Sequence, residues 1–152
     1  MVFPLTALLI AAADQLTKIW IRSSLALGQS IPDTGFFQLT YIHNTGAVFG
    51  LFRDQSFLLT IVASVGVVFL LLYAFFIHRQ FPFLNSMLGK LALGLILGGT
   101  VGNLIDRLRF GYVTDFISVG IWPVFNIADS AVTVGAIVVA YSLLRLVRAE
   151  KH

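Results

Sequence analysis

The chain has 152 residues, of which 58% are hydrophobic and only 11% are charged, and its mean hydropathy is +0.92. Soluble domains usually carry about 25% charged residues, so this composition indicates a membrane protein of single-domain length. The net charge of +3 is too small to argue for nucleic-acid binding, and the absence of cysteine excludes disulfides, thiolate catalysis and cysteine-ligated metals. His43, His78 and His152 are scattered, so neither a metal site nor a cofactor is expected.

Four apolar segments are long enough to cross a bilayer, since a spanning α-helix needs about 20 mostly apolar residues. The first segment lacks a basic start and is interrupted by Asp14 and Lys18, so we interpret it as a retained span and not as a signal peptide. The second segment carries no charge at all. The predicted spans are residues 2–21, 57–77, 88–108 and 130–147, all within one membrane-embedded domain that covers residues 1–152.

The segments that connect these spans differ in character. The connection between the second and third spans is short, whereas residues 22–56 contain IPDTGFFQLTYIHNTGAVFGLF, in which aromatic and β-branched residues alternate with turn-forming ones. That pattern predicts strands and turns. Residues 109–129 also look irregular or extended. With four spans, both of these long segments lie on the same side of the membrane.

Basic residues suggest which side this is, because cytoplasmic loops are enriched in lysine and arginine. Arg79 and Lys90 flank the short loop, and further basic residues lie at the C-terminus. We therefore expect both termini in the cytoplasm and residues 22–56 and 109–129 outside it. The raw count does not decide the orientation, because five basic residues fall on the other side: Lys18, Arg22, Arg53, Arg107 and Arg109.

Polar residues within the spans follow helical spacing. Asp14, Thr17 and Lys18 share one face of the first span, where Asp14 and Lys18 can form an ion pair. In the third span, Gly99, Asn103, Asp106 and Arg107 share a face, and Gly98, Gly99 and Gly102 allow another backbone to approach closely. Asp14–Lys18 and Asp106–Arg107 are then either structural ion pairs or groups with a direct functional role.

Asp115 and Asp129 have no basic residue within helical reach. The plain interpretation of Asp129 is an N-cap of the fourth span, and Asp115 could be an ordinary loop acid. Both nevertheless belong to one outer segment and have apolar neighbours. Two carboxylates that lie close together in an apolar setting do not both ionise easily, so one can act as a base while the other acts as an acid. Spacing in the sequence leaves open whether the two meet in space.

Five motifs in order resemble the lipoprotein signal peptidases, or signal peptidase II, which are membrane-embedded aspartic proteases. The match extends over essentially the whole chain. The motifs are DQLTK (residues 14–18), NTGAVF (44–49), GNLIDR (102–107), VTDF (113–116) and FNIAD (125–129).

The resemblance implies cleavage of a bacterial prolipoprotein just before a cysteine that carries a diacylglyceryl group. It implies that Asp115 and Asp129 form the catalytic dyad and that Lys18 and Asp106 belong to structural ion pairs. It also implies an expected location in the bacterial cytoplasmic membrane, with the active site at the outer leaflet and membrane lipids as neighbours. We expect a monomer. Substrate binding or support of the site is implied for Asp14, Asn44, Gly46, Asn103, Arg107 and Asn126.

The expected fold is mainly α, with four transmembrane helices and a small extracytoplasmic β-sheet, a cradle, between helices 1 and 2 at about residues 38–49. Edge strands of this kind can align an extended peptide. Asn44-Thr45-Gly46 is typical of a turn. The glycine-lined face of the third span is a candidate groove for the lipid tails of the substrate.

Two other classes of function compete with a protease. A small transporter or proton channel would also use intramembrane acids, amides and arginine. Against it, the acids cluster at one side, apart from Glu150, and no half-helix repeat is visible. A noncatalytic scaffold would tolerate replacement of both Asp115 and Asp129, but it leaves the cost of burying those acids unexplained.

Overall fold

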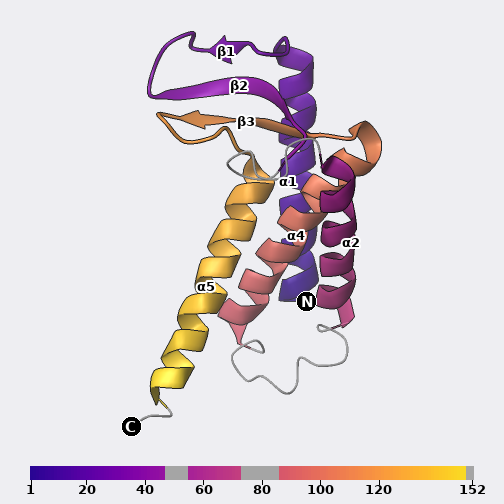
Figure 1. The fold of residues 1–152 in the computed structure, drawn as a ribbon. Coiled ribbons are helices and arrows are strands. Elements are labelled where there is room, and N and C mark those ends of the chain that lie inside the picture. Colours follow the sequence, from indigo (N-terminus) through magenta and orange to yellow (C-terminus); the bar gives the residue numbers. More distant parts are fainter. Residues whose placement is uncertain (47–54, 73–85, 150–152) are drawn as a thin grey trace.

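The computed structural model describes residues 1–46, 55–72 and 86–149 as a helical bundle with a small sheet at one end (Figure 1). Both chain termini lie at the other end of the bundle, away from the sheet. In chain order the elements are α1 (Val2–Ser24), β1 (Ser30–Ile31), β2 (Phe37–Asn44), α2 (Ser56–Leu72), α4 (Met87–Phe110), β3 (Val113–Val119) and α5 (Ile127–Ala149).

Three of the helices are long and apolar enough to cross a membrane. These are α1, α4 and residues Ile127–Arg145 of α5, which confirms three of the four predicted spans. The apolar helix α2 is described over 17 residues, and the rest of the predicted span at residues 57–77 lies outside the described residues. The helices extend beyond the predicted spans, because α1 continues to Ser24, α4 covers Met87–Phe110 and α5 begins at Ile127.

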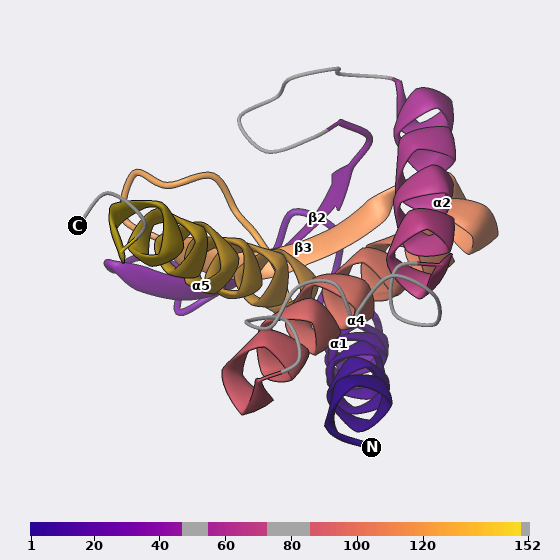
Figure 2. The same cartoon turned by 90° about the horizontal axis from the view of Figure 1, so that it is seen from below.

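Helix α4 lies at the centre of the bundle and contacts α1, α5 and α2 (Figure 2). Its glycines make the close approach possible, as predicted. A Cβ atom added at Gly98 would lie 2.6 Å from the carbonyl oxygen of Ala7 in α1. On another face of α4, a Cβ at Gly99 would collide with the carbonyl oxygen of Ala128 in α5. The expected lipid groove on this glycine face is therefore wrong, because neighbouring backbones fill the space.

Both ends of α4 carry signals that are visible in the sequence. Ser86 is the N-cap, and its side chain accepts a hydrogen bond of 3.1 Å from the backbone N–H of Gly89. Gly111 ends the helix with φ +78°, a left-handed conformation that glycine adopts without strain, and its N–H donates to the carbonyl oxygen of Arg107. The chain then turns directly into β3.

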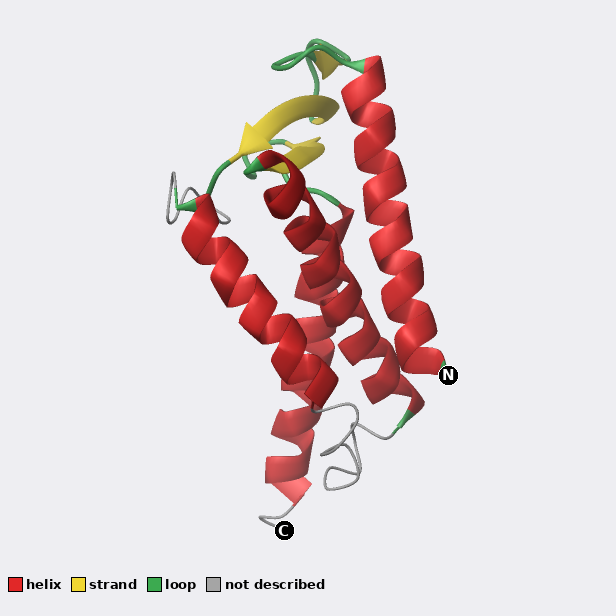
Figure 3. Ribbon diagram, turned by 90° about the vertical axis from the view of Figure 1, so that its right-hand side faces the viewer, coloured by secondary structure: helices red, strands yellow, loops and turns green. Residues whose placement is uncertain are grey.

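The three strands form an antiparallel sheet in the order β1-β2-β3 (Figure 3). The predicted cradle is confirmed as a small sheet, but the prediction missed that β3, from the second long segment, completes it. The register places Leu39 opposite Ile117 and Ile42 opposite Asp115, so β2 has one extra residue between these pairs. This irregularity leaves Asn44 diagonally opposite Asp115.

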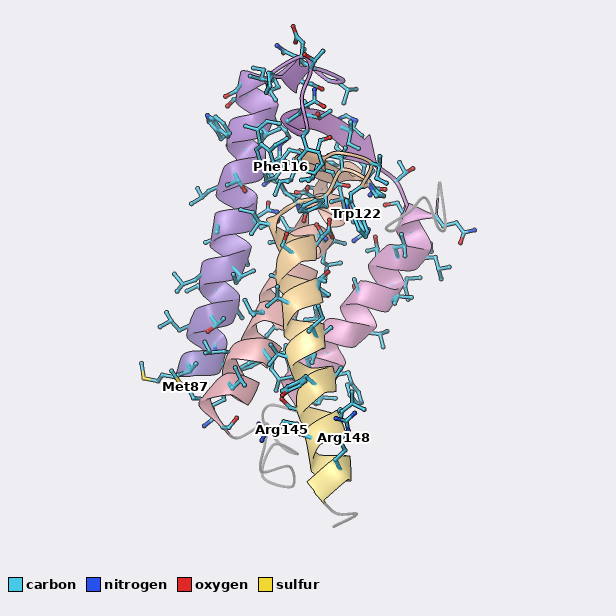
Figure 4. All side chains as sticks on the ribbon, turned by 90° about the vertical axis from the view of Figure 1, so that its left-hand side faces the viewer. Met87, Phe116, Trp122, Arg145 and Arg148 are labelled. Atoms are coloured by element: carbon cyan, nitrogen blue, oxygen red, sulfur yellow. The ribbon has the colours of Figure 1, made fainter. Side chains whose placement is uncertain are left out.

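A small core holds the sheet on the end of α1. It consists of Ile21, Leu25, Tyr41 and Phe116, all buried. Figure 4 shows Phe116 and Trp122 at the sheet end of the molecule, with Met87, Arg145 and Arg148 at the opposite end. The described parts of the two long segments between helices therefore lie at the same end of the bundle and pack together in the sheet.

Candidate active site

The chain after β3 folds back on itself and brings the start of α5 beside Asp115. The turn passes through Gly120, at φ +52°, and the chain then pairs again with β3. The N–H of Phe125 donates to the carbonyl oxygen of Ile117 over 3.0 Å, and the N–H of Ile117 donates to the carbonyl oxygen of Phe125 over 2.7 Å. Asn126, the next residue, therefore enters the interior next to Asp115.

Asn126 and Asp129 cap α5 reciprocally. The backbone N–H of Asp129 donates to Asn126 Oδ1 over 2.9 Å, and the backbone N–H of Asn126 donates to Asp129 Oδ2 over 3.3 Å. This is the geometry of a capping box, with Asn126 before the helix and Asp129 at its third residue. The expectation that Asp129 itself is the N-cap is therefore wrong, since Asn126 takes that position.

Asn126 also binds Asp115, so one amide side chain connects the two acids. Asn126 Nδ2 donates to Asp115 Oδ1 over 2.6 Å, and Asn44 Nδ2 donates to Asp115 Oδ2 over 2.8 Å. The Oδ1 atom of Asn44 accepts from the N–H of Gly46 over 2.9 Å, which confirms the predicted turn. Each oxygen of the Asp115 carboxylate is thus held by a neutral amide donor.

The surroundings of Asp115 make its carboxyl group a weaker acid than that of an ordinary aspartate. Its side chain is completely buried, and the pKa of Asp115 is raised by its surroundings from the usual value to about 7. The negative charge of Asp129 raises the pKa of Asp115, while the amides of Asn44 and Asn126 act in the opposite direction. Burial is the largest cause, because it removes water from the charged form.

Asp129 has a second amide partner from α4. Asn103 Nδ2 donates to Asp129 Oδ1 over 2.8 Å. The Oδ1 atom of Asn103 accepts from Asn126 Nδ2 over 3.0 Å and from Lys18 Nζ over 2.8 Å. Three asparagines from three different parts of the chain therefore surround the two acids.

A buried ionic cluster lies behind these amides. Lys18 Nζ lies 2.8 Å from Asp14 Oδ2, which confirms the predicted ion pair, and 3.4 Å from Asp106 Oδ2. Arg22 Nη1 approaches Asp106 Oδ1 to 3.6 Å. All of these side chains are completely buried except that of Arg22, which is 16% exposed. Two cations thus balance two anions, as buried charges require.

The two acids of this cluster support the backbone of the site. Asp14 Oδ1 accepts from the N–H of Ala128 over 3.0 Å, at the start of α5. Asp106 Oδ2 accepts from the N–H of Thr114 over 2.9 Å, next to Asp115 in β3. Because both carboxylates are completely buried, their contacts in this structure are with the protein itself. Asp14 and Asp106 therefore hold the segments that carry Asp129 and Asp115.

Arg107 does not join this cluster. The structure shows no ion pair between Asp106 and Arg107, both described residues, and Asp106 turns toward Lys18 and Arg22 instead. Arg107 Nη2 lies 3.4 Å from the carbonyl oxygen of Gly46, and Arg107 Nε is buried without a hydrogen-bond partner. The prediction of an Asp106–Arg107 pair is therefore wrong, and Arg107 retains a free donor near the acids.

A cavity of about 210 Å³ opens beside these groups. Helix α2 contributes only Ala63 to its walls, and α4 and α5 contribute the rest. A carboxyl group, an amide and a guanidinium thus face one space, and small side chains form its other walls. The remaining lining residues are Thr100, Asn103, Arg107, Asp129, Val132 and Thr133.

Some polar contacts were not predicted from the sequence. Gln15 Nε2 donates to the carbonyl oxygen of Gly102 over 2.9 Å and to Asp106 Oδ1 over 3.2 Å, and Arg22 Nη1 donates to Thr114 Oγ1 over 2.8 Å. The signal for Arg22 was its spacing, because residues 14, 18 and 22 lie on one helical face. The hydroxyl of Thr17, which was predicted to share that polar face, donates to the carbonyl oxygens of Ala13 and Asp14 in its own helix. Over residues 1–46, 55–72 and 86–149, no three histidine or acidic side chains gather as metal ligands would.

Comparison with known proteins places this arrangement in a family. The family model of Signal peptidase (SPase) II matches residues 6–145. A lipoprotein signal peptidase of Dehalococcoides mccartyi (strain CBDB1) is 59% identical over 82% of this chain and 78% of its own. That of Moorella thermoacetica is 46% identical over 95% of this chain and 93% of its own.

Solved structures agree with the sequence comparison. A bacterial membrane enzyme solved at 2.3 Å resolution superposes with a TM-score of 0.80 and 31% identity, covering 93% of this chain and 86% of that one. One conclusion follows from three observations. The family model matches nearly the whole chain, several helices are long enough to span a membrane, and the fold is shared with a solved structure. The chain belongs to the signal peptidase II family and is a multi-pass membrane protease of bacterial type.

Proposed function

We propose that this chain is an aspartic endopeptidase that cleaves diacylglyceryl-modified prolipoproteins just before the lipidated cysteine. The observation that carries the proposal is the bridge by Asn126, which binds Asp115 through its side chain and Asp129 through its backbone. Two acids joined by one asparagine, one of which lines a cavity, can activate water without a metal or a nucleophilic side chain. The names of the relatives support a prolipoprotein as the substrate.

In the proposed mechanism, the two acids divide the proton transfers between them. The ionised carboxylate removes a proton from a water molecule as the water oxygen bonds to the scissile carbonyl carbon. The protonated carboxyl supplies the proton that the departing amine takes up when the C–N bond breaks. Asp115 suits the second role, because its raised pKa keeps its proton at a pH where an ordinary aspartate has lost it.

Arg107 is the proposed contact for the peptide backbone of the substrate. Its Nε atom is buried without a partner, and its side chain lines the cavity together with Asp129. A carbonyl oxygen of a bound peptide would satisfy this donor, which is costly to leave unpaired. Asn44, Gly46, Asn103 and Asn126 are proposed to support the site, since each is bonded to one of the acids or to its neighbours.

The decisive experiment offers the purified chain two forms of one prolipoprotein, with and without the diacylglyceryl group. We expect cleavage of the lipidated form alone, with mass spectrometry placing the new N-terminus at the modified cysteine. Cleavage of both forms at equal rates would contradict the proposed specificity for lipid. Absence of cleavage in both, with a folded protein, would contradict the proposed function itself.

The pH dependence of cleavage follows from the raised pKa of Asp115. If activity requires one protonated and one ionised carboxyl, kcat/KM falls as the pH rises through about 7, where Asp115 loses its proton. The hydrogen bond from Asn44 lowers the pKa of Asp115 because it favours the ionised form. Asn44→Ala is therefore expected to move the alkaline limb of the profile to higher pH, measured between about pH 5 and about pH 9.

Gln38→Ala is the matched control for this shift. Gln38 lies on the same strand, but its side chain donates to the carbonyl oxygen of Pro32, away from the acids. The control should reproduce the alkaline limb of the unmodified chain. An alkaline limb that stays in place in Asn44→Ala, or moves to lower pH, would show that Asp115 does not govern it.

We also propose that the sheet lies on the outer side of the membrane and both termini on the cytoplasmic side. Because the chain contains no cysteine, single cysteines can report this orientation. Ile121, beside the sheet, and Arg148, near the far end of α5, both have exposed side chains. A membrane-impermeant maleimide should label Ile121→Cys in intact cells and label Arg148→Cys only after permeabilisation. The reverse pattern would invert the proposed topology.

A further inference from the structure

The ammonium group of Lys18 has three acceptors and no exposed surface. Its Nζ atom lies 2.8 Å from Asp14 Oδ2, 2.8 Å from Asn103 Oδ1 and 3.4 Å from Asp106 Oδ2. An ammonium group has three N–H donors, so each can be assigned to one acceptor. Lys18 is also absent from the lining of the cavity, and its side chain is completely buried. With all three donors assigned to acceptors within the protein, Lys18 has none left for a substrate bound in that cavity.

Two of these three contacts are ion pairs, but the third sets the orientation of an amide. The amide oxygen of Asn103 faces Lys18, and its NH₂ group donates to Asp129 Oδ1 over 2.8 Å. The oxygen and nitrogen ends of an amide have nearly the same shape, so packing alone does not distinguish them. The inverted amide would place its NH₂ group against the ammonium and its oxygen against the carboxylate. Both contacts would then be repulsive.

The Asn126 amide is oriented in a similar way toward the other acid, Asp115. Asn126 Nδ2 donates to Asn103 Oδ1 over 3.0 Å and to Asp115 Oδ1 over 2.6 Å. Asn126 Oδ1 is occupied by the N–H of Asp129, which leaves only its NH₂ group to face Asp115. Lys18 is thus linked to Asp129 through one amide and to Asp115 through two. Hydrogen bonds in such a chain polarise one another in a medium of low dielectric constant.

We propose that Lys18 is a positioning residue for catalysis, whose buried ammonium orients the Asn103 amide so that it donates to Asp129. This role is separate from the ion pairs of Lys18 with Asp14 and Asp106, and it rests on the proposed function of the two acids. A direct contact between Lys18 and Asp129 would favour the ionised carboxylate strongly. The intervening amide conveys orientation while keeping the positive charge one residue away from the reacting groups.

The variant Asp106→Asn distinguishes the proposed role of Lys18 from a purely structural role in the ion pairs. This variant removes an ion pair of Lys18 but leaves the contact with Asn103 in place. Asparagine at position 106 also keeps a carbonyl oxygen that can accept from the N–H of Thr114. We expect Asp106→Asn to lower the melting temperature but to lower kcat less than Lys18→Met does, because the oriented amide of Asn103 is retained.

Lys18→Met, which removes the donors but keeps the length of the side chain, is expected to lower kcat by about tenfold to a hundredfold, as is typical for residues that orient functional groups. KM should stay within about twofold, because Lys18 does not line the cavity. Both constants are measured on the purified full chain with the lipidated prolipoprotein, alongside thermal unfolding. A raised KM with unchanged kcat would overturn the proposal.

A double-mutant cycle with Asn103→Ala gives the sharpest test. If Lys18 acts through Asn103, adding Lys18→Met to Asn103→Ala lowers kcat little further, because the oriented amide is already absent. Additive losses would overturn the proposal. If Lys18→Met yields no folded protein, the cycle is run on the Asp106→Asn background, where one of the two freed acids is neutral.

Asp115→Asn in the same assay separates this proposal from the proposed function. Full activity of Asp115→Asn would overturn the function, and the role of Lys18 with it. An inactive Asp115→Asn together with additive effects in the cycle would overturn the role of Lys18 alone. An inactive Asp115→Asn together with a non-additive cycle is the result that supports both.

Discussion

Asp115→Asn is expected to lower kcat by at least about 10³-fold, since general acid–base groups contribute up to about 10⁴-fold each and a dyad acts as a unit. Asparagine has nearly the same size as aspartate and can still accept a hydrogen bond at its carbonyl oxygen. The partners of Asp115, Asn44 and Asn126, are both neutral amides, so the substitution leaves no charge unpaired. The NH₂ group of the new asparagine would face one of these two amide donors, so the melting temperature should fall slightly, while the large loss appears in activity, measured by cleavage of the lipidated substrate.

Asp33→Asn is the matched control for this result. Asp33 is an exposed acid between β1 and β2, and its replacement changes the charge of the chain by the same amount. It should cleave at the rate of the unmodified chain. Asp129→Asn should be as inactive as Asp115→Asn, and the double variant no worse than either single one. An Asp115→Asn variant that cleaves normally would contradict the assignment of the dyad.

Gly99→Val should have the largest effect on stability among the helix substitutions considered. A Cβ atom at position 99 would collide with the backbone oxygen of Ala128, which cannot turn away as a side chain can. Overpacking of this kind typically costs about 1–3 kcal/mol, and contact with a helix backbone places the expected cost near the upper value. Because Asp129 follows Ala128, activity should also be lost.

The control for Gly99→Val is Gly66→Val in α2. A Cβ atom at Gly66 would meet nothing within 4 Å, so the substitution should leave the melting temperature in detergent nearly unchanged. Equal losses in the two variants would mean that valine is harmful in any of these helices. In that case the close contact between α4 and α5 would not explain the effect.

The arrangement of charges around the acids has a simple electrostatic consequence. The described side chains that donate to the carboxylates of Asp115 and Asp129 are amides, while Lys18 lies behind Asn103. A lysine or arginine in direct contact with Asp115 would stabilise the ionised form and lower its pKa. Neutral donors hold the carboxylate in place and still allow a pKa of about 7, which a general acid needs near neutral pH.

Much of the fold followed from local patterns in the sequence. Apolar length predicted four spanning helices, three of which are confirmed, and the i, i+4 spacing predicted the ion pair of Asp14 with Lys18. The glycines of α4 predicted close helix contacts, and Asn44-Thr45-Gly46 predicted a turn. These predictions were accurate because each depends on residues within a few positions of one another, where helix or turn geometry sets the distances.

Only the tertiary structure showed which polar side chains pair across the site. Asn44 binds Asp115 across 71 positions in the chain, and Lys18 binds Asn103 across 85. The sequence placed Asp106 with Arg107, but rotation along α4 turns Asp106 toward α1 and Arg107 toward the cavity. It also assigned the cap of α5 to Asp129, whereas the return of the chain along β3 gives that place to Asn126. The sequence therefore determined which polar groups are buried, and the packing of α1, α4, α5 and the sheet decided which of them meet, because only that packing sets distances between remote residues.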